Sequence, residues 1–199
     1  SDGSLMQRSM KKATPEKKNV SELLSGPLYV NEIFYNPPEG QLEFIEIINT
    51  ADSAVTLSLP IGSKTGVWEI SGLGDSDLET LSIPAGGLLL MLPDTNILDL
   101  EAYAATLSKD VVLQKYSGKI SNRGEQILVK EPYAFVEDLT KPNAIDWCYR
   151  WSDVVLYSDD GLWSEEADGM GMSLHRADYS MPGSDPGAWT ANLPTPGEK

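Results

Sequence analysis

Cysteine and histidine are almost absent from this chain of 199 residues, which contains one of each, Cys148 and His175. A single cysteine excludes an intrachain disulfide and a multi-cysteine zinc site, and a single histidine excludes a histidine-rich metal site. Long apolar runs are also absent: the longest, residues 86–92, ends at Pro93 and is far shorter than the ~18 residues that a membrane-spanning helix needs. The sequence therefore predicts neither a disulfide framework nor a transmembrane segment.

Positive charge is scarce, since 15 basic residues face 30 acidic ones and leave a net charge of −15. This balance excludes the phosphate neutralisation on which nucleic-acid binding depends. Residues 1–27 differ from the rest, because they carry a net +2 and leave −17 for the remainder. They contain no aromatic residue, no periodic apolar pattern and no apolar stretch of the kind found in signal peptides. We expect a flexible basic tether over 1–27 and a single domain over 28–199.

Short runs of β-branched and aromatic residues alternate with turn clusters from Leu28 onward, which is the pattern of an all-β protein. Turn signals recur at intervals typical of a sandwich or a barrel. One stretch, residues 96–108, has a helical period that predicts one or two turns of helix. The predicted strands cover residues 28–35, 43–49, 54–58, 67–70, 80–83, 88–92, 111–114, 125–130, 145–149, 153–157 and 172–176.

Strand alternation also assigns side chains to faces. In the strand 43–49 it places Ile45 and Ile47 on one face, and Phe44, Glu46 and Ile48 on the other. Alternation places Glu32 and Glu46 on the same face of their strands as the aromatic residues. It predicts that both carboxylates face solvent.

Several phrases, read in order, resemble the lamin-tail domain, an immunoglobulin-like β-sandwich that also occurs in bacterial extracytoplasmic proteins. They extend over residues 28–197, nearly everything after the tether. The phrases are 30–37 (VNEIFYNP), 43–49 (EFIEIIN), 54–58 (AVTLS), 83–90 (IPAGGLLL), 116–128 (YSGKISNRGEQIL), 153–157 (DVVLY), 163–176 (WSEEADGMGMSLHR), 185–189 (DPGAW) and 194–197 (PTPG).

The resemblance implies an immunoglobulin-like antiparallel β-sandwich and a non-catalytic module for interaction or attachment. It places the chain in a bacterial protein outside the cytoplasm, secreted, periplasmic or on the cell surface, with protein or cell-surface polysaccharide as the partner. Residues 131–152 depart from the family, because they are longer than its usual short hairpin. Trp147, Cys148 and Trp151 therefore have no counterpart in it.

Catalytic motifs are missing: the chain has no nucleophile elbow, Walker loop, zinc-protease helix or dinucleotide fingerprint. His175 lies in an alternating strand where it shares a face with Ser173, and we interpret it as a structural or surface histidine. Cys148, between two aromatic residues, is interpreted as a core or half-buried thiol. A hydrolase with a carboxylate pair is the weakest of the function hypotheses.

Acidic loops supply the clearest chemical signal, because they place hard oxygen donors beside glycines, and calcium prefers six to eight such ligands. The loop 159–168 is the best candidate for a structural calcium ion, although the EF-hand pattern is absent; the competing interpretation is a solvated acidic surface. The candidate ligands are Asp159, Asp160, Glu165, Glu166 and Asp168.

Five tryptophans offer a second kind of binding surface, since exposed rings in a row would stack on sugars. A carbohydrate-binding module that uses exposed tryptophans is therefore the alternative to the interaction module, although packing in the core is the expected role of most large aromatic residues. The five are Trp68, Trp147, Trp151, Trp163 and Trp189.

Overall fold

The structure is a computed structural model that describes residues 26–95, 99–137 and 145–198. These residues are built mainly of strands, with one short helix, α1 (Leu100–Ala104), and two 3-10 turns, η1 (Glu165–Ala167) and η2 (Pro186–Ala188). The predicted all-β sandwich is confirmed, and α1 falls inside the predicted helical stretch 96–108. The predicted tether lies almost entirely outside the described residues.

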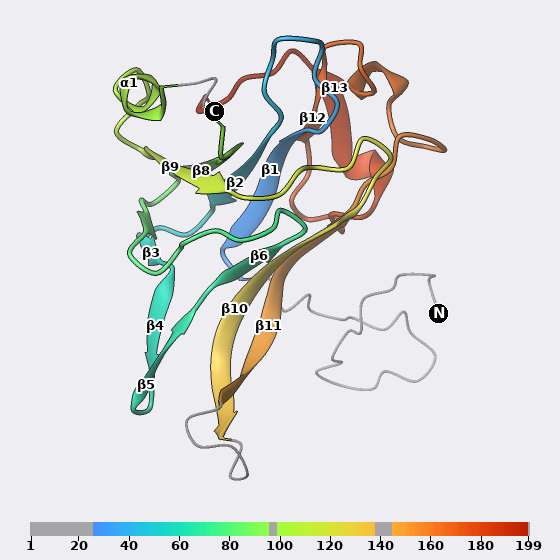
Figure 1. Cartoon of the computed structure of the whole chain (residues 1–199). Coiled ribbons are helices and arrows are strands. Elements are labelled where there is room, and N and C mark those ends of the chain that lie inside the picture. Colours follow the sequence, from blue (N-terminus) through green and yellow to red (C-terminus); the bar gives the residue numbers. More distant parts are fainter. Residues whose placement is uncertain (1–25, 96–98, 138–144, 199) are drawn as a thin grey trace, which may run out of the picture.

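The larger sheet has six strands, and Figure 1 shows it forming the upper part of the molecule. Its order is β13 (Trp189–Asn192), β12 (Ser173–Arg176), β1 (Leu28–Phe34), β2 (Phe44–Asn49), β8 (Leu88–Pro93) and β9 (Val111–Tyr116). All neighbouring strands are antiparallel except β8 and β9, which pair in parallel through the connection that carries α1. The sheet is therefore mixed, which corrects the purely antiparallel expectation.

The second layer contains a three-stranded sheet of β11 (Ile145–Leu156), β10 (Gln126–Glu137) and β6 (Glu69–Ser71). Two small pairs complete it: β3 (Val55–Thr56) with β7 (Ser82–Ile83), and β4 (Ser58–Ile61) with β5 (Lys64–Val67). The core lies between the layers, where Ile45, Ile47 and Leu89 of the large sheet share one buried cluster with Ile127 and Val155 of the small one.

The outer face of the large sheet is covered as well. Phe34 and Phe44 form a second buried cluster, against which Tyr103 and Leu107 pack from the α1 segment. Beside this cluster the chain after β13 runs back over β1 and β2 toward α1 (Figure 1). We call this segment, residues 193–198, the C-terminal strap.

A β-bulge in β1 decides which side chains reach the outer face. Val30 pairs with Ile47 and Glu32 pairs with Glu46, so that Asn31 is an extra residue between them. Because a bulge places two residues opposite one, the inward parity of β1 changes at this point. Glu32 and Glu46 consequently lie opposite each other on the outer face.

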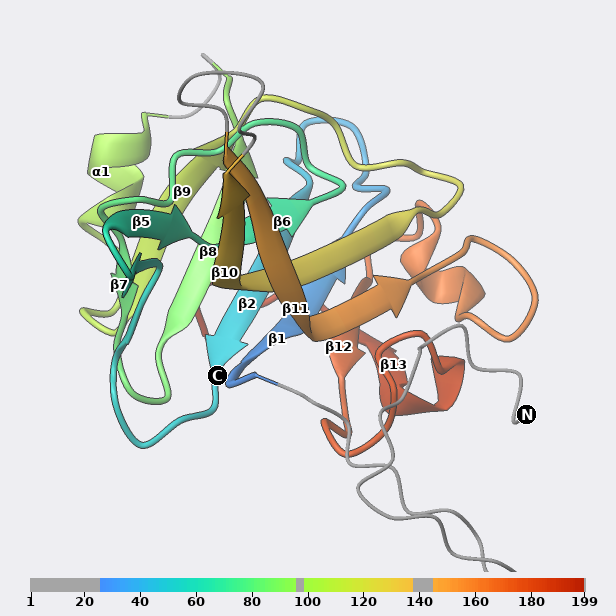
Figure 2. The ribbon, with the colours of Figure 1, turned by 90° about the horizontal axis from the view of Figure 1, so that it is seen from below.

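The β10–β11 hairpin extends well beyond the sandwich (Figure 1), and it lies in front of the large sheet in the view from below (Figure 2). We call its outer part, residues 131–137 and 145–151, the arm. The β4–β5 hairpin packs against one face of the arm: a Cβ at Gly66 would lie 2.8 Å from Pro132 and 2.9 Å from Trp147. Only glycine at this position lets the two hairpins approach so closely.

Candidate functional site

The acidic loop is laid out along the surface. Asp168 accepts a hydrogen bond from Asn36 Nδ2 at 2.7 Å, and Asp160 accepts one from Ser158 Oγ at 2.8 Å. Across the described ranges no three Asp, Glu, His or Cys side chains are grouped so that they could hold a metal ion. The structure therefore does not bring together Asp159, Asp160, Glu165, Glu166 and Asp168, and calcium binding by this loop stays a prediction.

His175 lies beside Ser173, as alternation predicts, with Ser173 Oγ 2.9 Å from His175 Nε2. Ser173 donates its hydroxyl hydrogen to Glu32 Oε1 at 2.5 Å, and His175 Nε2 lies 3.3 Å from the same oxygen. In a serine-hydrolase triad the acid contacts Nδ1 and the serine contacts Nε2. Here both contact Nε2, and Ser173 and Glu32 are fully buried. The geometry is that of a structural cluster, without access for a substrate.

Glu32 and Glu46 are both 0% exposed, so the prediction that they face solvent is wrong. The C-terminal strap covers them. Glu32 accepts hydrogen bonds from the backbone N–H and the hydroxyl of Thr195, each at 3.0 Å. Glu46 accepts from Gly197 N at 2.8 Å and from Asn31 Nδ2 at 2.6 Å. Each carboxylate is therefore an acceptor that fastens the strap to the sheet.

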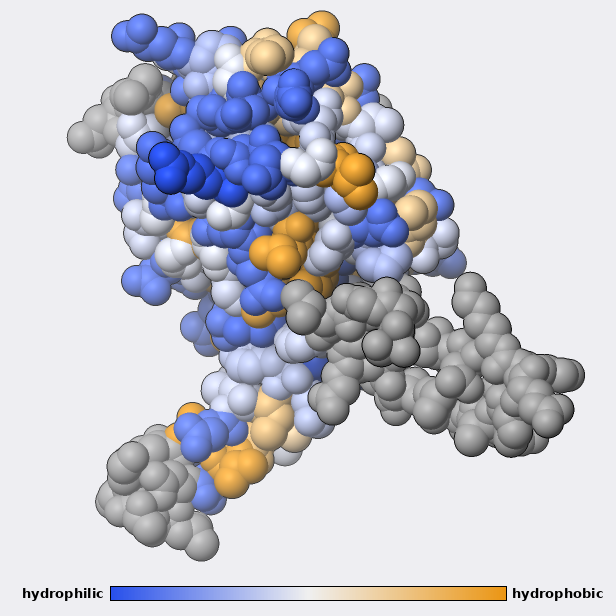
Figure 3. All heavy atoms as spheres, turned by 90° about the vertical axis from the view of Figure 1, so that its right-hand side faces the viewer, coloured by the Kyte–Doolittle hydropathy of each residue, from blue (hydrophilic) through white to orange (hydrophobic). Residues whose placement is uncertain are grey.

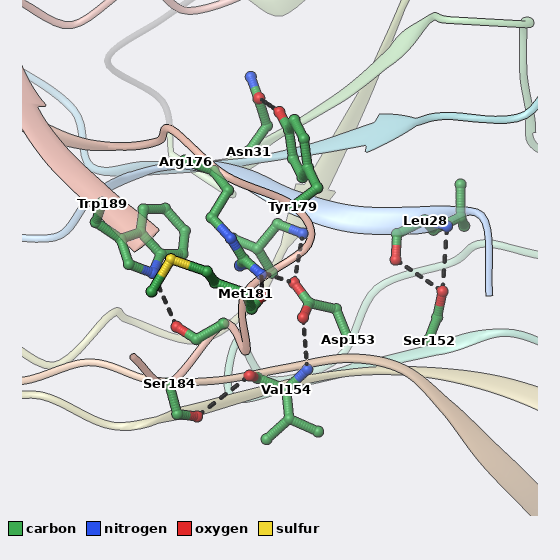
Figure 4. Close-up of polar contacts among 12 residues, drawn as sticks. Leu28, Asn31, Ser152, Asp153, Val154, Arg176, Tyr179, Met181, Ser184 and Trp189 are labelled. Carbon is green, nitrogen blue, oxygen red and sulfur yellow. Dashed lines mark hydrogen bonds and ion pairs between the residues drawn. The ribbon is translucent and has the colours of Figure 1, made fainter. Parts of the chain in front are cut away.

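A buried ion pair joins β11 to β12 (Figure 4). Asp153 Oδ2 lies 3.3 Å from Arg176 Nη1 and accepts a hydrogen bond from Val30 N at 3.0 Å. The Arg176 guanidinium also donates to two loop carbonyl oxygens and lies 5.1 Å from the centre of the Trp189 ring. Since both partners are almost completely buried, the pair holds the two layers together and offers nothing to a ligand.

A groove of about 390 Å³ lies where the β1–β2 and β9–β10 loops meet the segment after β8. Its polar groups are largely engaged. Glu43 Oε1 accepts from the Tyr116 hydroxyl at 2.9 Å, and Asn36 both donates to Asp168 and accepts from Asn122 Nδ2 at 2.6 Å. Burial and the adjacent Glu43 raise the pKa of the Tyr116 hydroxyl, which therefore acts as a neutral donor. The lining residues are Asn36, Pro37, Gln41, Leu42, Glu43, Pro93, Thr95, Gly118, Lys119 and Asn122.

The tryptophans do not form a row of exposed rings. Trp68 and Trp189 are buried, and Trp163 packs on Trp189 with the ring centres 6.1 Å apart. Trp147 packs edge-on against a phenylalanine of the opposite strand of the arm. Trp151 is 42% exposed. Packing is thus the main role of these rings, as expected.

The arm exposes large apolar side chains, as do Leu162, Met170 and Leu193 elsewhere on the surface. Tyr133 is 56% exposed and Val136 is 59% exposed, and both lie with Trp151 on the arm. Figure 3 shows hydrophobic atoms gathered near the end of the arm. Cys148 is half-buried there, as predicted. The sequence predicts a strand over 145–149 and an insertion over 131–152, but it does not predict this exposed apolar surface, because a surface apolar cluster has no signature distinct from a core strand.

No family model matches the chain, and neither a curated protein nor a solved structure matches it. No helix in the described part of the chain is long and apolar enough to span a membrane. The fold defines the chain as an all-β sandwich protein from which the arm extends.

Proposed function

We propose that this chain is a non-catalytic interaction module, similar to the lamin-tail domain, of a bacterial secreted or cell-surface protein. The arm is the surface that contacts protein or cell-envelope material. The location outside the cytoplasm and the family both rest on the sequence phrases that resemble the lamin-tail domain.

One observation carries the proposal: the polar side chains that resemble catalytic groups are buried and bonded within the fold, whereas large apolar side chains of the arm are open to solvent. Glu32, Ser173 and Asp153 are all less than a tenth exposed. Exposed aromatic and aliphatic side chains on a projecting element are typical of interaction surfaces.

The test is co-sedimentation of the purified chain with cell-envelope fragments of a Gram-negative and a Gram-positive bacterium. The arm variant Tyr133→Ser/Trp151→Ser is expected to lose most of the bound fraction. The control variant Leu162→Ser/Met170→Ser removes two exposed side chains, 87% and 67% exposed, from the connection between β11 and β12, outside the arm, and is expected to bind like the wild type. Absence of binding by the wild type, or equal binding by both variants, would contradict the proposal.

The carbohydrate-binding alternative rests on Trp151 and Tyr133, which are both exposed on the arm. Stacking on a sugar needs an open aromatic face. Affinity electrophoresis in gels that contain soluble polysaccharide distinguishes the two functions. Retardation that Trp151→Ala abolishes would favour carbohydrate, and unchanged migration would favour a protein partner.

A further inference from the structure

Among the described residues, none pairs with the outer edge of β11 along the arm. β11 pairs with β10 on one side, and β10 in turn pairs with β6, so β11 is an edge strand of 12 residues. Near the sandwich the edge is occupied: Ser152 exchanges hydrogen bonds with Leu28, and Ser184 Oγ accepts from Leu156 N at 2.9 Å. Over residues 145–151 the described part of the chain offers no backbone partner other than β10. Long free edges are templates for pairing with another chain.

The side chains along this edge are complementary to those of the same strand in a second copy of the chain. Asp146, Cys148 and Arg150 alternate with the aromatic residues Trp147 and Tyr149. If two copies of the strand pair antiparallel about a two-fold axis at Cys148, Asp146 of each copy lies opposite Arg150 of the other. Asp146 and Arg150 are each two residues from Cys148. An axis at any other residue of 145–151 would therefore not place them opposite each other. Opposite charges placed directly across a strand pair stabilise it.

Arg150 retains the capacity for this second carboxylate. Its Nε and Nη2 donate to Glu131 at 2.6 and 2.8 Å, and among the described residues its Nη1 donates no hydrogen bond. A guanidinium carries five N–H donors. Asp146 and Arg150 are both exposed, so neither needs to leave a buried site to form the pair.

The other face of the paired strands would be apolar. The same register sets Trp147 opposite Tyr149 and Ile145 opposite Trp151 of the second copy, and such pairs add to sheet stability. It covers part of the exposed ring of Trp151. Antiparallel pairing places the two sandwiches at opposite ends of the shared ribbon.

We propose that the free edge of β11 binds a second copy of this chain, forming an antiparallel two-fold dimer with Cys148 on the axis. The interface is isologous, as in most homodimers. The inference shares with the proposed function only the assignment of contact to the arm, and the dimer forms without any envelope material.

The first test is charge exchange, measured by sedimentation equilibrium of Asp146→Arg, Arg150→Asp and their equimolar mixture. In each single variant both cross-strand pairs become like charges, and we expect the dimer dissociation constant to rise at least about tenfold. In the mixture the heterodimer regains both opposite pairs and is expected to match the wild type. Circular dichroism and thermal melts show whether each variant is folded; Asp146→Arg leaves the Arg150–Glu131 pair intact and is the cleaner variant.

The second test uses Cys148 as a reporter of register. Facing residues of an antiparallel pair have Cα atoms about 4.5–5.5 Å apart, within the range that a disulfide spans. Diamide, which takes up the two thiol hydrogens, is expected to give a covalent dimer from the wild type. The variant Asp146→Cys/Cys148→Ser carries its thiol off the axis and is expected to give no covalent dimer under the same treatment.

A wild-type chain that is monomeric up to about 1 mM would overturn the dimer, as would a mixture of charge variants that behaves like either variant alone. A monomer that still sediments with envelope fragments would refute this inference and leave the proposed function standing. A dimer that binds no envelope material would support this inference and contradict the proposed function.

Discussion

Glu46 makes the stability of the fold depend on pH. Its carboxyl is fully buried, with Glu32 opposite it and His175 beside Glu32. Burial raises the pKa of Glu46 from 4.5 to about 7, and hydrogen bonds from Gly197 and Asn31 hold it below the value that burial alone would give. Uncharged Glu46 is thus favoured in the folded protein up to about pH 7.

The sign of the effect follows from proton linkage. Because the pKa is higher in the folded state than in the unfolded state, the folded chain binds the proton more tightly between pH 4.5 and 7. The resulting stabilisation is fully present below pH 4.5 and is lost as the pH rises through 7. At about 1.4 kcal/mol per pH unit, the difference in pKa corresponds to about 3 kcal/mol of unfolding free energy. Burial also raises the pKa of Glu125 and of Asp153. The pH dependence of the wild type alone therefore does not separate the contribution of Glu46 from theirs.

The assay is urea unfolding at pH 5, 6, 7 and 8 for the wild type and Glu46→Gln. Glutamine is close in shape to the protonated carboxyl and does not titrate, but its amide nitrogen cannot accept one of the two hydrogen bonds that Glu46 receives, so the variant bears a constant cost at every pH. Between pH 5 and pH 8 the wild type should therefore lose up to about 3 kcal/mol more of its unfolding free energy than the variant. Glu165→Gln, which removes an exposed carboxyl, is expected to keep the wild-type dependence on pH. Equal pH dependence in Glu46→Gln and the wild type would refute the reasoning.

Three further predictions concern the other buried groups and the acidic loop. Asp153→Ala, which leaves the Arg176 charge buried and unpaired, is expected to cost about 3–5 kcal/mol of unfolding free energy in urea, and a cost below 1 kcal/mol would contradict the structural role of the pair. Tyr35→Phe removes a buried hydroxyl that has no partner among the described residues and should leave the melting temperature unchanged or raised, whereas Tyr157→Phe, whose hydroxyl is hydrogen-bonded, should lower it by the equivalent of about 1–2 kcal/mol. The calcium site predicted for residues 159–168 requires a melting temperature that rises in millimolar calcium relative to EDTA and does not rise in magnesium; an unchanged value refutes it.

The strands of the large sheet were predictable because their apolar residues alternate and their ends carry turn residues. Residues 43–49 and 88–92 were predicted within one residue of β2 and β8. The β4–β5 hairpin was not predicted, because Pro60, Gly62 and Gly66 interrupt any strand pattern. Contact with the arm stabilises this hairpin instead, and that contact lies far away in the sequence.

The sequence predicts two separate strands, 145–149 and 153–157, where the structure has the single continuous strand β11. Register shifts near Pro132 and Ser152 let the hairpin continue where alternation breaks. A bulge changes which face a side chain occupies without ending the strand. Periodicity alone therefore divides a bulged strand at the bulge.

The buried carboxylates show a second limit of local reasoning. Alternation placed Glu46 on the outer face correctly, but the residue that covers it, Gly197, is 151 positions away. Whether an outer face meets water depends on what the rest of the chain lays over it, and no pattern within the strand records that. The same argument applies to Glu32 and to the strap at Thr195.

The resemblance to the lamin-tail domain separates the sandwich from residues 131–152. The phrases that resemble the lamin-tail domain include β1, β2, β8 and the strap, and their polar residues are used in closing the sandwich. Residues 131–152 lie outside that resemblance, and they carry the free strand edge, exposed aromatic rings and the alternation of Asp146 with Arg150. Under the proposed function, recognition falls to residues 131–152, because the buried carboxylates of the sandwich are hydrogen-bonded within it. Shortening the β10–β11 hairpin should therefore remove partner contacts while the buried core of the sandwich remains intact.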